Sequence, residues 1–206
     1  MTVIRASVVP RLLRACVLAG GASRRMGADK ALLPHPRGGT WIDNTVAMAR
    51  ALDLQVLVLS GHPRHREHLA SRFPDLSVLP EPWPPAGPLQ AFAAVFSARV
   101  DEAWLVLPID LPYLTSPALE TLLVAWREQE HAALVAHDGE RQQPLLGIYP
   151  GMAGSHAALE RQLGRGCHRW HDWLDLIPHR SFFLPPEQLL NANHPADLAA
   201  LTDGEF

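Results

Sequence analysis

The sequence predicts an α/β fold of three layers, in which a mostly parallel β-sheet is covered on both faces by helices. Short apolar runs alternate with helical patterns over residues 15–130. The runs are apolar without interruption, which is typical of strands buried on both faces. Of the 206 residues, 48% are hydrophobic and 19% charged, a globular composition. We therefore expect a tail over residues 1–14 and a single domain over residues 15–206.

Each strand is expected where a short apolar run is ended by glycine, proline, serine or an acidic residue. In chain order these runs are residues 15–19, 55–59, 77–79, 103–109, 132–136, 144–149 and 182–184. Five prolines forbid a regular strand between residues 80 and 88.

Each helix is expected where apolar residues recur at three or four positions. These segments are residues 40–52, 63–72, 89–100, 116–130, 153–163 and 167–174. Thr40 or Asp43 is the expected cap of the first helix, and Pro117 suits the first turn of the fourth.

Charge and cysteine content exclude several classes of protein. The net charge of −3 gives no basic field for nucleic acid, so no nucleic-acid partner is expected. Cys16 and Cys167 are too few for a disulfide framework or a four-cysteine zinc site. The sequence contains no run of 18 apolar residues, so no membrane span is expected. The N-terminal residues lack the apolar core of a signal peptide. We expect a soluble, cytoplasmic protein without a membrane partner.

The segment after the first expected strand carries the features of a polyphosphate site. Gly20 and Gly21 let the backbone approach an anion and expose amide donors to it. Arg24, Arg25 and Lys30 add charge-assisted donors within the same loop. The glycine spacing excludes both the P-loop and the dinucleotide fingerprint. The alternative is a glycine turn with incidental surface arginines.

Asp110 follows the most hydrophobic expected strand and is the best candidate for a metal ligand. Mg²⁺ prefers a few carboxylates together with phosphate oxygens and water. The alternative is an aspartate that closes a turn with Pro112 or caps the helix near Pro117.

Three histidines, His62, His65 and His68, are spaced by three and share one face of an expected helix. Such spacing is compatible with a metal site, but a solvated helix face is favoured.

Several segments together resemble the molybdenum cofactor guanylyltransferase family, within the nucleotidyltransferase superfamily. The segments that carry the resemblance are Leu18-Ala19-Gly20-Gly21, Arg25-Met26-Gly27, Lys30, Gly87-Pro88-Leu89, Asp110-Leu111-Pro112, Gln143-Pro144-Leu145 and Asn191-Ala192-Asn193. The likeness spans residues 15–201. It implies a Rossmann-like nucleotidyltransferase fold and transfer of GMP from GTP to the terminal phosphate of molybdopterin, with release of pyrophosphate.

The resemblance also implies roles for individual residues. Arg25, Lys30 and Asp110 are the implied catalytic residues, with Asp110 binding Mg²⁺. The implied nucleotide-binding residues are Leu18, Ala19, Gly20, Gly21, Arg24, Lys30, Ser60, Glu81, Gly87 and Asp110. The residues expected to meet the pterin are Gln143, Asn191 and Asn193, with a helix cap as the alternative for Asn193.

The chain departs from the family pattern at three positions. Ser60 stands where relatives often have asparagine, Glu81 stands in place of an aspartate, and Gln90 stands in place of a small residue. Gly20 stands where cytidine-using relatives tend to have alanine, which favours guanine.

Two further functions stay open. One is a nucleotidyltransferase of the same fold that uses CTP or a sugar phosphate. The other is a nucleotide-binding protein without turnover that supports cofactor insertion. The expected partners are GTP and molybdopterin as substrates, with a molybdoenzyme or a cofactor-insertion protein as the protein partner.

Overall fold

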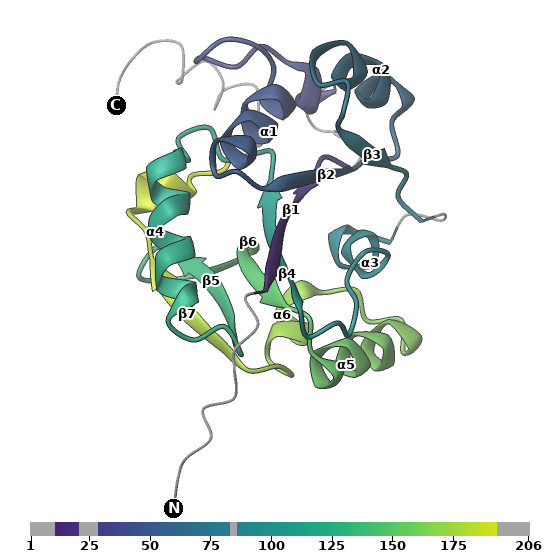
Figure 1. Ribbon diagram of the computed structural model, residues 1–206, viewed down its shortest axis with the longest axis vertical. Helices are drawn as coiled ribbons and strands as arrows, with labels where there is room; N and C mark the ends of the chain where they lie inside the picture. Colours follow the sequence, from purple (N-terminus) through teal and green to yellow (C-terminus); the bar gives the residue numbers. More distant parts are fainter. Residues whose placement is uncertain (1–10, 21–28, 83–85, 193–206) are drawn as a thin grey trace, which may run out of the picture.

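The computed structural model describes residues 11–20, 29–82 and 86–192, drawn in colour in Figure 1. Gly21, Arg24, Arg25 and Asn193 lie outside these residues. The described part contains a seven-stranded sheet in the order β3-β2-β1-β4-β6-β5-β7. Its strands are β1 (Leu12–Leu18), β2 (Gln55–Leu59), β3 (Ser77–Leu79), β4 (Glu102–Pro108), β5 (Ala133–His137), β6 (Gln142–Pro150) and β7 (His179–Phe183).

Strand direction follows the prediction of a mostly parallel sheet. β1 is parallel to both β2 and β4, β2 is parallel to β3, and β5 is parallel to β7. Among the described strands, β6 alone is antiparallel to its neighbours, β4 and β5. Its amino end therefore lies at the same edge of the sheet as the carboxyl ends of the other strands.

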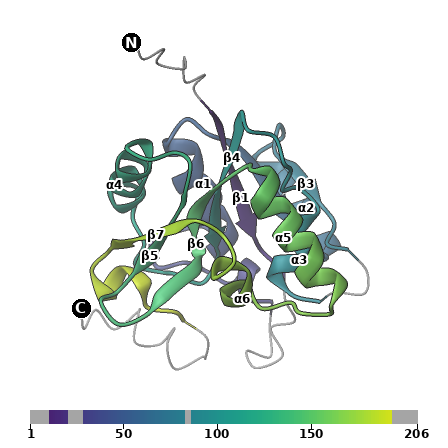
Figure 2. The same ribbon diagram turned by 90° about the horizontal axis from the view of Figure 1, so that it is seen from below.

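Helices cover both faces of the sheet, as expected. One face carries α1 (Trp41–Ala51), α2 (Pro63–Arg72) and α4 (Ser116–Arg127), and the other carries α3 (Pro88–Ala93), α5 (Ala153–Gly164) and α6 (Trp170–Leu174). Figure 2 shows α1 and α4 on one side of the sheet and α3 and α5 on the other. Two short 3₁₀ helices, η1 (Lys30–Leu32) and η2 (Pro186–Leu189), complete the described elements. None of the described helices has the length and apolar character needed to cross a membrane.

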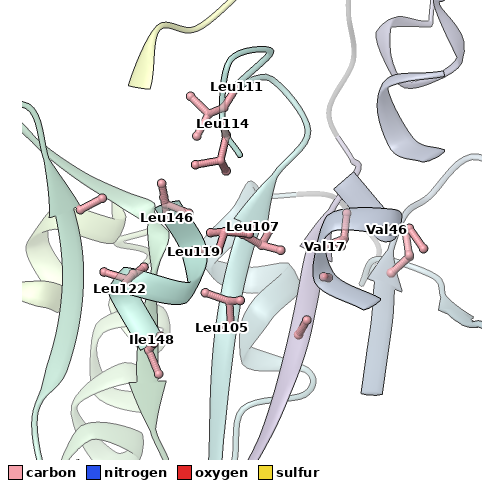
Figure 3. Packing of buried hydrophobic residues seen from close by; sticks show 14 of the residues in the cluster. Val17, Val46, Leu105, Leu107, Leu111, Leu114, Leu119, Leu122, Leu146 and Ile148 are labelled. Carbon is pink, nitrogen blue, oxygen red and sulfur yellow. The ribbon is translucent and has the colours of Figure 1, made fainter. Parts of the chain in front are cut away.

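The central strands are buried on both faces, which confirms the interpretation of their apolar runs. In β1, Leu13 and Val17 point into one core cluster, whereas Cys16 and Leu18 point into the other. Figure 3 shows the first cluster, where residues of β4 lie between Val17 of β1 and side chains of α4. β1 begins at Leu12, three residues before the expected start at residue 15, because Leu12 to Arg14 pair with β4. The boundary of the expected tail therefore lies before Leu12.

One expected helix is much shorter than predicted. The helix expected over residues 89–100 is α3, which ends at Ala93. The hydroxyl of Ser97 accepts a hydrogen bond from the amide of Arg99 and donates to the carboxylate of Glu102. A serine that bonds locally in this way competes with helix around residue 97. Closer to Ala93, the amides of Ala94 and Val95 donate to the carbonyls of Ala91 and Phe92 three residues back, which ends the α-helical pattern. The other expected strands and helices are present with small shifts at their ends.

The start of α1 is fixed by a capping box that also binds α2. The Thr40 hydroxyl accepts from the amide of Asp43, and the Asp43 carboxylate accepts from the amide of Thr40. Thr40 is therefore the cap, with Asp43 as its reciprocal partner. From α2, Nε2 of His68 lies 2.9 Å from Oδ1 of Asp43, and Nε of Arg72 lies 3.1 Å from Oδ2.

The loop between η1 and α1 holds the segment that follows Asp110. The guanidinium of Arg37 donates to the carbonyl of Leu114 at 2.9 Å and to the carbonyl of Pro112 at 3.1 Å. Beside it, His35 is buried and its Nδ1 accepts the amide of Arg37. Burial and the charge of Arg37 lower the pKa of His35 to about 4, although a hydrogen bond to the backbone of Pro112 raises this pKa in part. His35 is therefore neutral at physiological pH.

We expect the Leu122→Ala variant to lose about 2–5 kcal/mol of unfolding free energy, because the fully buried side chain leaves a cavity beneath α4. Val124, on the same helix, is 68% exposed, and Val124→Ala should change stability by less than about 0.5 kcal/mol. Urea unfolding of both variants measures the difference. Equal losses would contradict the assignment of the core face.

His35 predicts a loss of stability in mild acid. Its pKa is 6.5 as a free group and about 4 in the folded protein, so between these values the unfolded chain binds the proton and the folded chain does not. The free energy of unfolding should fall by on the order of 2 kcal/mol as the pH is lowered through this window. In His35→Asn, which keeps an acceptor for the amide of Arg37, the fall should be smaller. Urea unfolding at several pH values measures this. If the free energy of unfolding depends on pH equally in the wild-type protein and in His35→Asn, His35 is not responsible for the loss of stability in acid.

Candidate functional site

The residues expected to bind a nucleotide gather at the carboxyl ends of four parallel strands. Ala19 follows β1, Ser60 follows β2 and Asp110 lies just after β4. The amide of Ala19 donates to the carbonyl of Leu59, and the amide of Ser60 donates to the carbonyl of Leu79, both at 3.0 Å. These bonds extend the ladder beyond the strands and keep their ends side by side. In an open α/β sheet, this edge forms the ligand crevice.

Gly20 is in close contact with Glu81, which follows β3. A Cβ atom built on Gly20 would overlap the carboxylate of Glu81, so a larger residue would displace that side chain. Glu81 is half-buried, and this burial raises the pKa of its carboxyl, against the opposing charge of His62. The absence of a side chain at Gly20 thus lets the acidic side chain of Glu81 lie against the end of β1.

Lys30 and Asp110 form the charged centre of the site. Nζ of Lys30 lies 3.7 Å from Oδ2 of Asp110 and 5.5 Å from the ring centroid of Trp41. The side chain of Lys30 is only 9% exposed, whereas that of Asp110 is 29% exposed. Burial raises the pKa of Asp110, and the ammonium of Lys30 opposes this shift. The carboxylate of Asp110 therefore lies beside the buried ammonium of Lys30 and is still accessible to solvent.

The chemistry of these donors fits Mg²⁺. A carboxylate that is accessible at the edge of the sheet, next to a loop rich in cations, can share a magnesium ion with phosphate oxygens and water. The described residues contain no cluster of three or more histidine, cysteine or acidic side chains of the kind that holds a metal without a substrate.

The segment after η2 also reaches Asp110. The amide of Ala192 donates to the carbonyl of Asp110 at 3.1 Å, directly after the exposed Asn191. Asn193 lies outside the described residues. On β6, Gln143 pairs with Ala136 at the ligand edge, because this strand runs against its neighbours. The expected position of Asn191 and Gln143 near the site agrees with this geometry, and their contact with a pterin stays a prediction.

Gly87 has a backbone conformation that suits glycine. Its φ of +99° lies in the region that other residues rarely adopt, and it precedes the first turn of α3. A helix of this length contributes little of its own to anion binding, so the role of Gly87 in nucleotide binding stays a prediction.

One residue of the site was interpreted wrongly from the sequence. His65 is completely buried, so the interpretation of a solvated histidine face is wrong at this position, although His62 is exposed. Nε2 of His65 lies 2.8 Å from the carboxylate of Asp29, and Nδ1 lies 2.7 Å from the hydroxyl of Ser60. The available signal was the four-residue spacing of His65 and Leu69, which places both on the inward face of α2.

Comparison with known proteins identifies a matching family and similar chains. The MobA-like NTP transferase domain matches residues 15–176. The chain is 33% identical over 195 residues to the probable molybdenum cofactor guanylyltransferase of Rhodopirellula baltica. The aligned region covers 92% of this chain and 91% of the relative. The chain is also 33% identical over 161 residues to the molybdenum cofactor guanylyltransferase of Xanthomonas euvesicatoria pv. vesicatoria, covering 74% of this chain and 79% of that protein.

A solved structure has the same fold. Molybdopterin-guanine dinucleotide biosynthesis protein A of Archaeoglobus fulgidus superimposes with a TM-score of 0.73 at 21% identity, over 92% of this chain and 97% of that chain. The predicted nucleotidyltransferase fold is thereby confirmed. Since the matched region contains the glycine loop, the strand ends and Asp110, the chain belongs to the MobA-like NTP transferase family, as its sequence signature predicted.

Proposed function

We propose that this protein is a molybdenum cofactor guanylyltransferase that transfers GMP from GTP to the terminal phosphate of molybdopterin in an Mg²⁺-dependent reaction. The observation that carries the proposal is the Lys30 and Asp110 pair at the ligand edge of the sheet. The names of relatives that cover most of the chain support the choice of substrates.

The reaction is a direct displacement at the α-phosphorus of GTP. An oxygen of the molybdopterin phosphate forms a bond to this phosphorus, and the bond from phosphorus to the bridging oxygen of the leaving pyrophosphate breaks. The electron pair of that bond leaves with pyrophosphate. A phosphate monoester has its second pKa at about 6 and is largely a dianion at neutral pH, so no general base is needed.

The protein must therefore bring two anions together and neutralise the charge that develops on the leaving group. Lys30 supplies a positive charge that Trp41 and Asp110 hold in place. When bound, Mg²⁺ would neutralise phosphate oxygens, with Asp110 as its protein ligand. Arg25 and Arg24 are proposed to bind the phosphates from the loop itself.

The nucleoside is proposed to lie over the ends of β1, β2 and β3. Gly20 lets the Glu81 side chain lie against the end of β1. Ser60 and Glu81 thus offer a hydroxyl and a carboxylate at that edge. Guanine presents ring and amino N–H donors, which suit carboxylate and hydroxyl acceptors. Gln143, Asn191 and Asn193 are proposed to face the pterin on the other side of Asp110.

Pyrophosphate release from purified protein with molybdopterin and Mg²⁺ tests the reaction. We expect release with GTP and little with CTP, and a loss of about 100-fold or more in Asp110→Asn, which cannot hold the metal. Asp75→Asn is the matched control, since Asp75 pairs with Arg50 near the amino ends of β2 and β3. Equal release with CTP would contradict the choice of base, and full activity of Asp110→Asn would contradict the metal site.

Lys30→Met tests the phosphate contact separately from the chemistry. Loss of a charge-assisted contact should weaken GTP binding by about 10-fold to 100-fold and guanosine binding much less, because guanosine lacks phosphates. Arg50→Met removes a cation at the opposite edge of the sheet and should leave both affinities unchanged. Calorimetric titration measures them. A variant that weakens GTP and guanosine equally would show that Lys30 does not bind the phosphates.

A further inference from the structure

Three segments of the site are joined by one buried histidine. His65 on α2 is completely buried and lies between Asp29, at the end of the phosphate loop, and Ser60, at the end of β2. Nε2 of His65 lies 2.8 and 3.0 Å from the two carboxylate oxygens of Asp29. Nδ1 lies 2.7 Å from the hydroxyl oxygen of Ser60. These are three close polar contacts from a side chain without solvent access.

The contacts determine the position of the ring proton. A carboxylate only accepts hydrogen bonds, so Nε2 carries the proton and donates it to Asp29. Burial lowers the pKa of His65, against the hydrogen bond and the charge of Asp29, while the nearby His62 and His68 lower it further. The ring is therefore neutral and Nδ1 is an acceptor, to which the Ser60 hydroxyl donates. The oxygen of Ser60 also accepts the amide of His62 at 3.1 Å.

Asp29 connects His65 to Lys30 through the short helix η1. One of its carboxylate oxygens accepts the amide of Ala31 at 3.2 Å and so caps the short helix η1. Lys30 is the first residue of η1 and extends to Asp110. If Asp29 lost its contact with His65, the helix that carries Lys30 would lose its attachment to α2. Loss of the His65 ring would also free the hydroxyl of Ser60 to turn, because Nδ1 is its acceptor.

We propose that His65 is a positioning residue for nucleotide binding, which holds the Lys30 end of the phosphate loop and the hydroxyl of Ser60 in one fixed arrangement. This inference rests on the proposed function for the nature of the ligand. His65 itself touches no substrate, since it is buried beneath both groups. It acts through Lys30 on the phosphates and through Ser60 on the nucleoside.

Binding of GTP and of guanosine to two variants tests the proposal. His65→Phe fills the space of the ring and removes both hydrogen bonds, and we expect it to weaken GTP binding about tenfold. His65→Gln can place its amide nitrogen near the position of Nε2, donate to Asp29 and recover most of the lost GTP affinity. Guanosine binding should not recover in this variant, because the partner of Ser60 is still missing.

His68→Phe is the matched control. It lies one turn further along α2 and also loses a histidine to aspartate hydrogen bond, with Asp43 at 2.9 Å. We expect it to change GTP affinity by less than about twofold, whatever its effect on the unfolding temperature. Thermal unfolding identifies the folded fraction of each variant. If folded His65→Phe, or folded His65→Gln should the former not fold, binds GTP and guanosine as the wild-type protein does, the proposal is wrong.

The outcome can be separated from that of the proposed function. If the wild-type protein binds another nucleoside triphosphate in place of GTP, the guanine assignment fails, and the variants are compared with that triphosphate. If it binds none of the four common ones, both proposals fail. Imidazole ¹⁵N NMR of the free protein gives a readout without any ligand, and a His65 ring protonated at Nδ1 alone would overturn the inference.

Discussion

The common direction of β1, β2, β3 and β4 is the constraint on which the site depends. Parallel strands place all their carboxyl ends at one edge, and the chain must then leave that edge through loops. Because both faces of these strands are buried by helices, their position is fixed by the core and not by the loops. Residues far apart in the sequence, such as Gly20, Ser60 and Asp110, can therefore act together.

Asp110 is held from several sides although it is the residue proposed to bind the metal. Arg37 binds two carbonyls of the segment that follows it, and Ala192 donates to its own carbonyl. Lys30 then faces its carboxylate from η1. These contacts restrain the backbone and leave the side chain partly accessible. A ligand held in this way requires little reorganisation when a charged substrate binds, which is favourable for charge stabilisation.

The repeated contacts between histidines of α2 and aspartates have different consequences along the helix. His65 is bound to Asp29, the residue before Lys30, whereas His68 is bound to Asp43 in the cap of α1. Both pairs join a histidine Nε2 to an aspartate carboxylate, at 2.8 Å and 2.9 Å. Their separation by one helical turn places one next to the site and the other in the scaffold.

The sequence predicted the fold because strands and helices depend on local patterns. Apolar runs predicted β1 and β4, and the position of Asp110 after a buried strand predicted that it lies at the carboxyl edge of the sheet. The sequence did not predict contacts between distant segments. Three such contacts depend on how the loops pack against the sheet. They are the bond of buried His65 to Asp29, the bond of Arg37 to the segment after Asp110, and the bond of the Ala192 amide to Asp110. The early end of α3 was missed because the competing bond of Ser97 goes to Glu102 on the next strand.

The most direct test of the central claim is a crystal structure with GTP and Mn²⁺, in which anomalous scattering locates the metal. We expect a manganese peak within coordination distance of a carboxylate oxygen of Asp110. We also expect the triphosphate between this metal and Lys30, with guanine near Ser60 and Glu81. A metal bound elsewhere, or a nucleotide away from the carboxyl ends of β1 and β4, would contradict it.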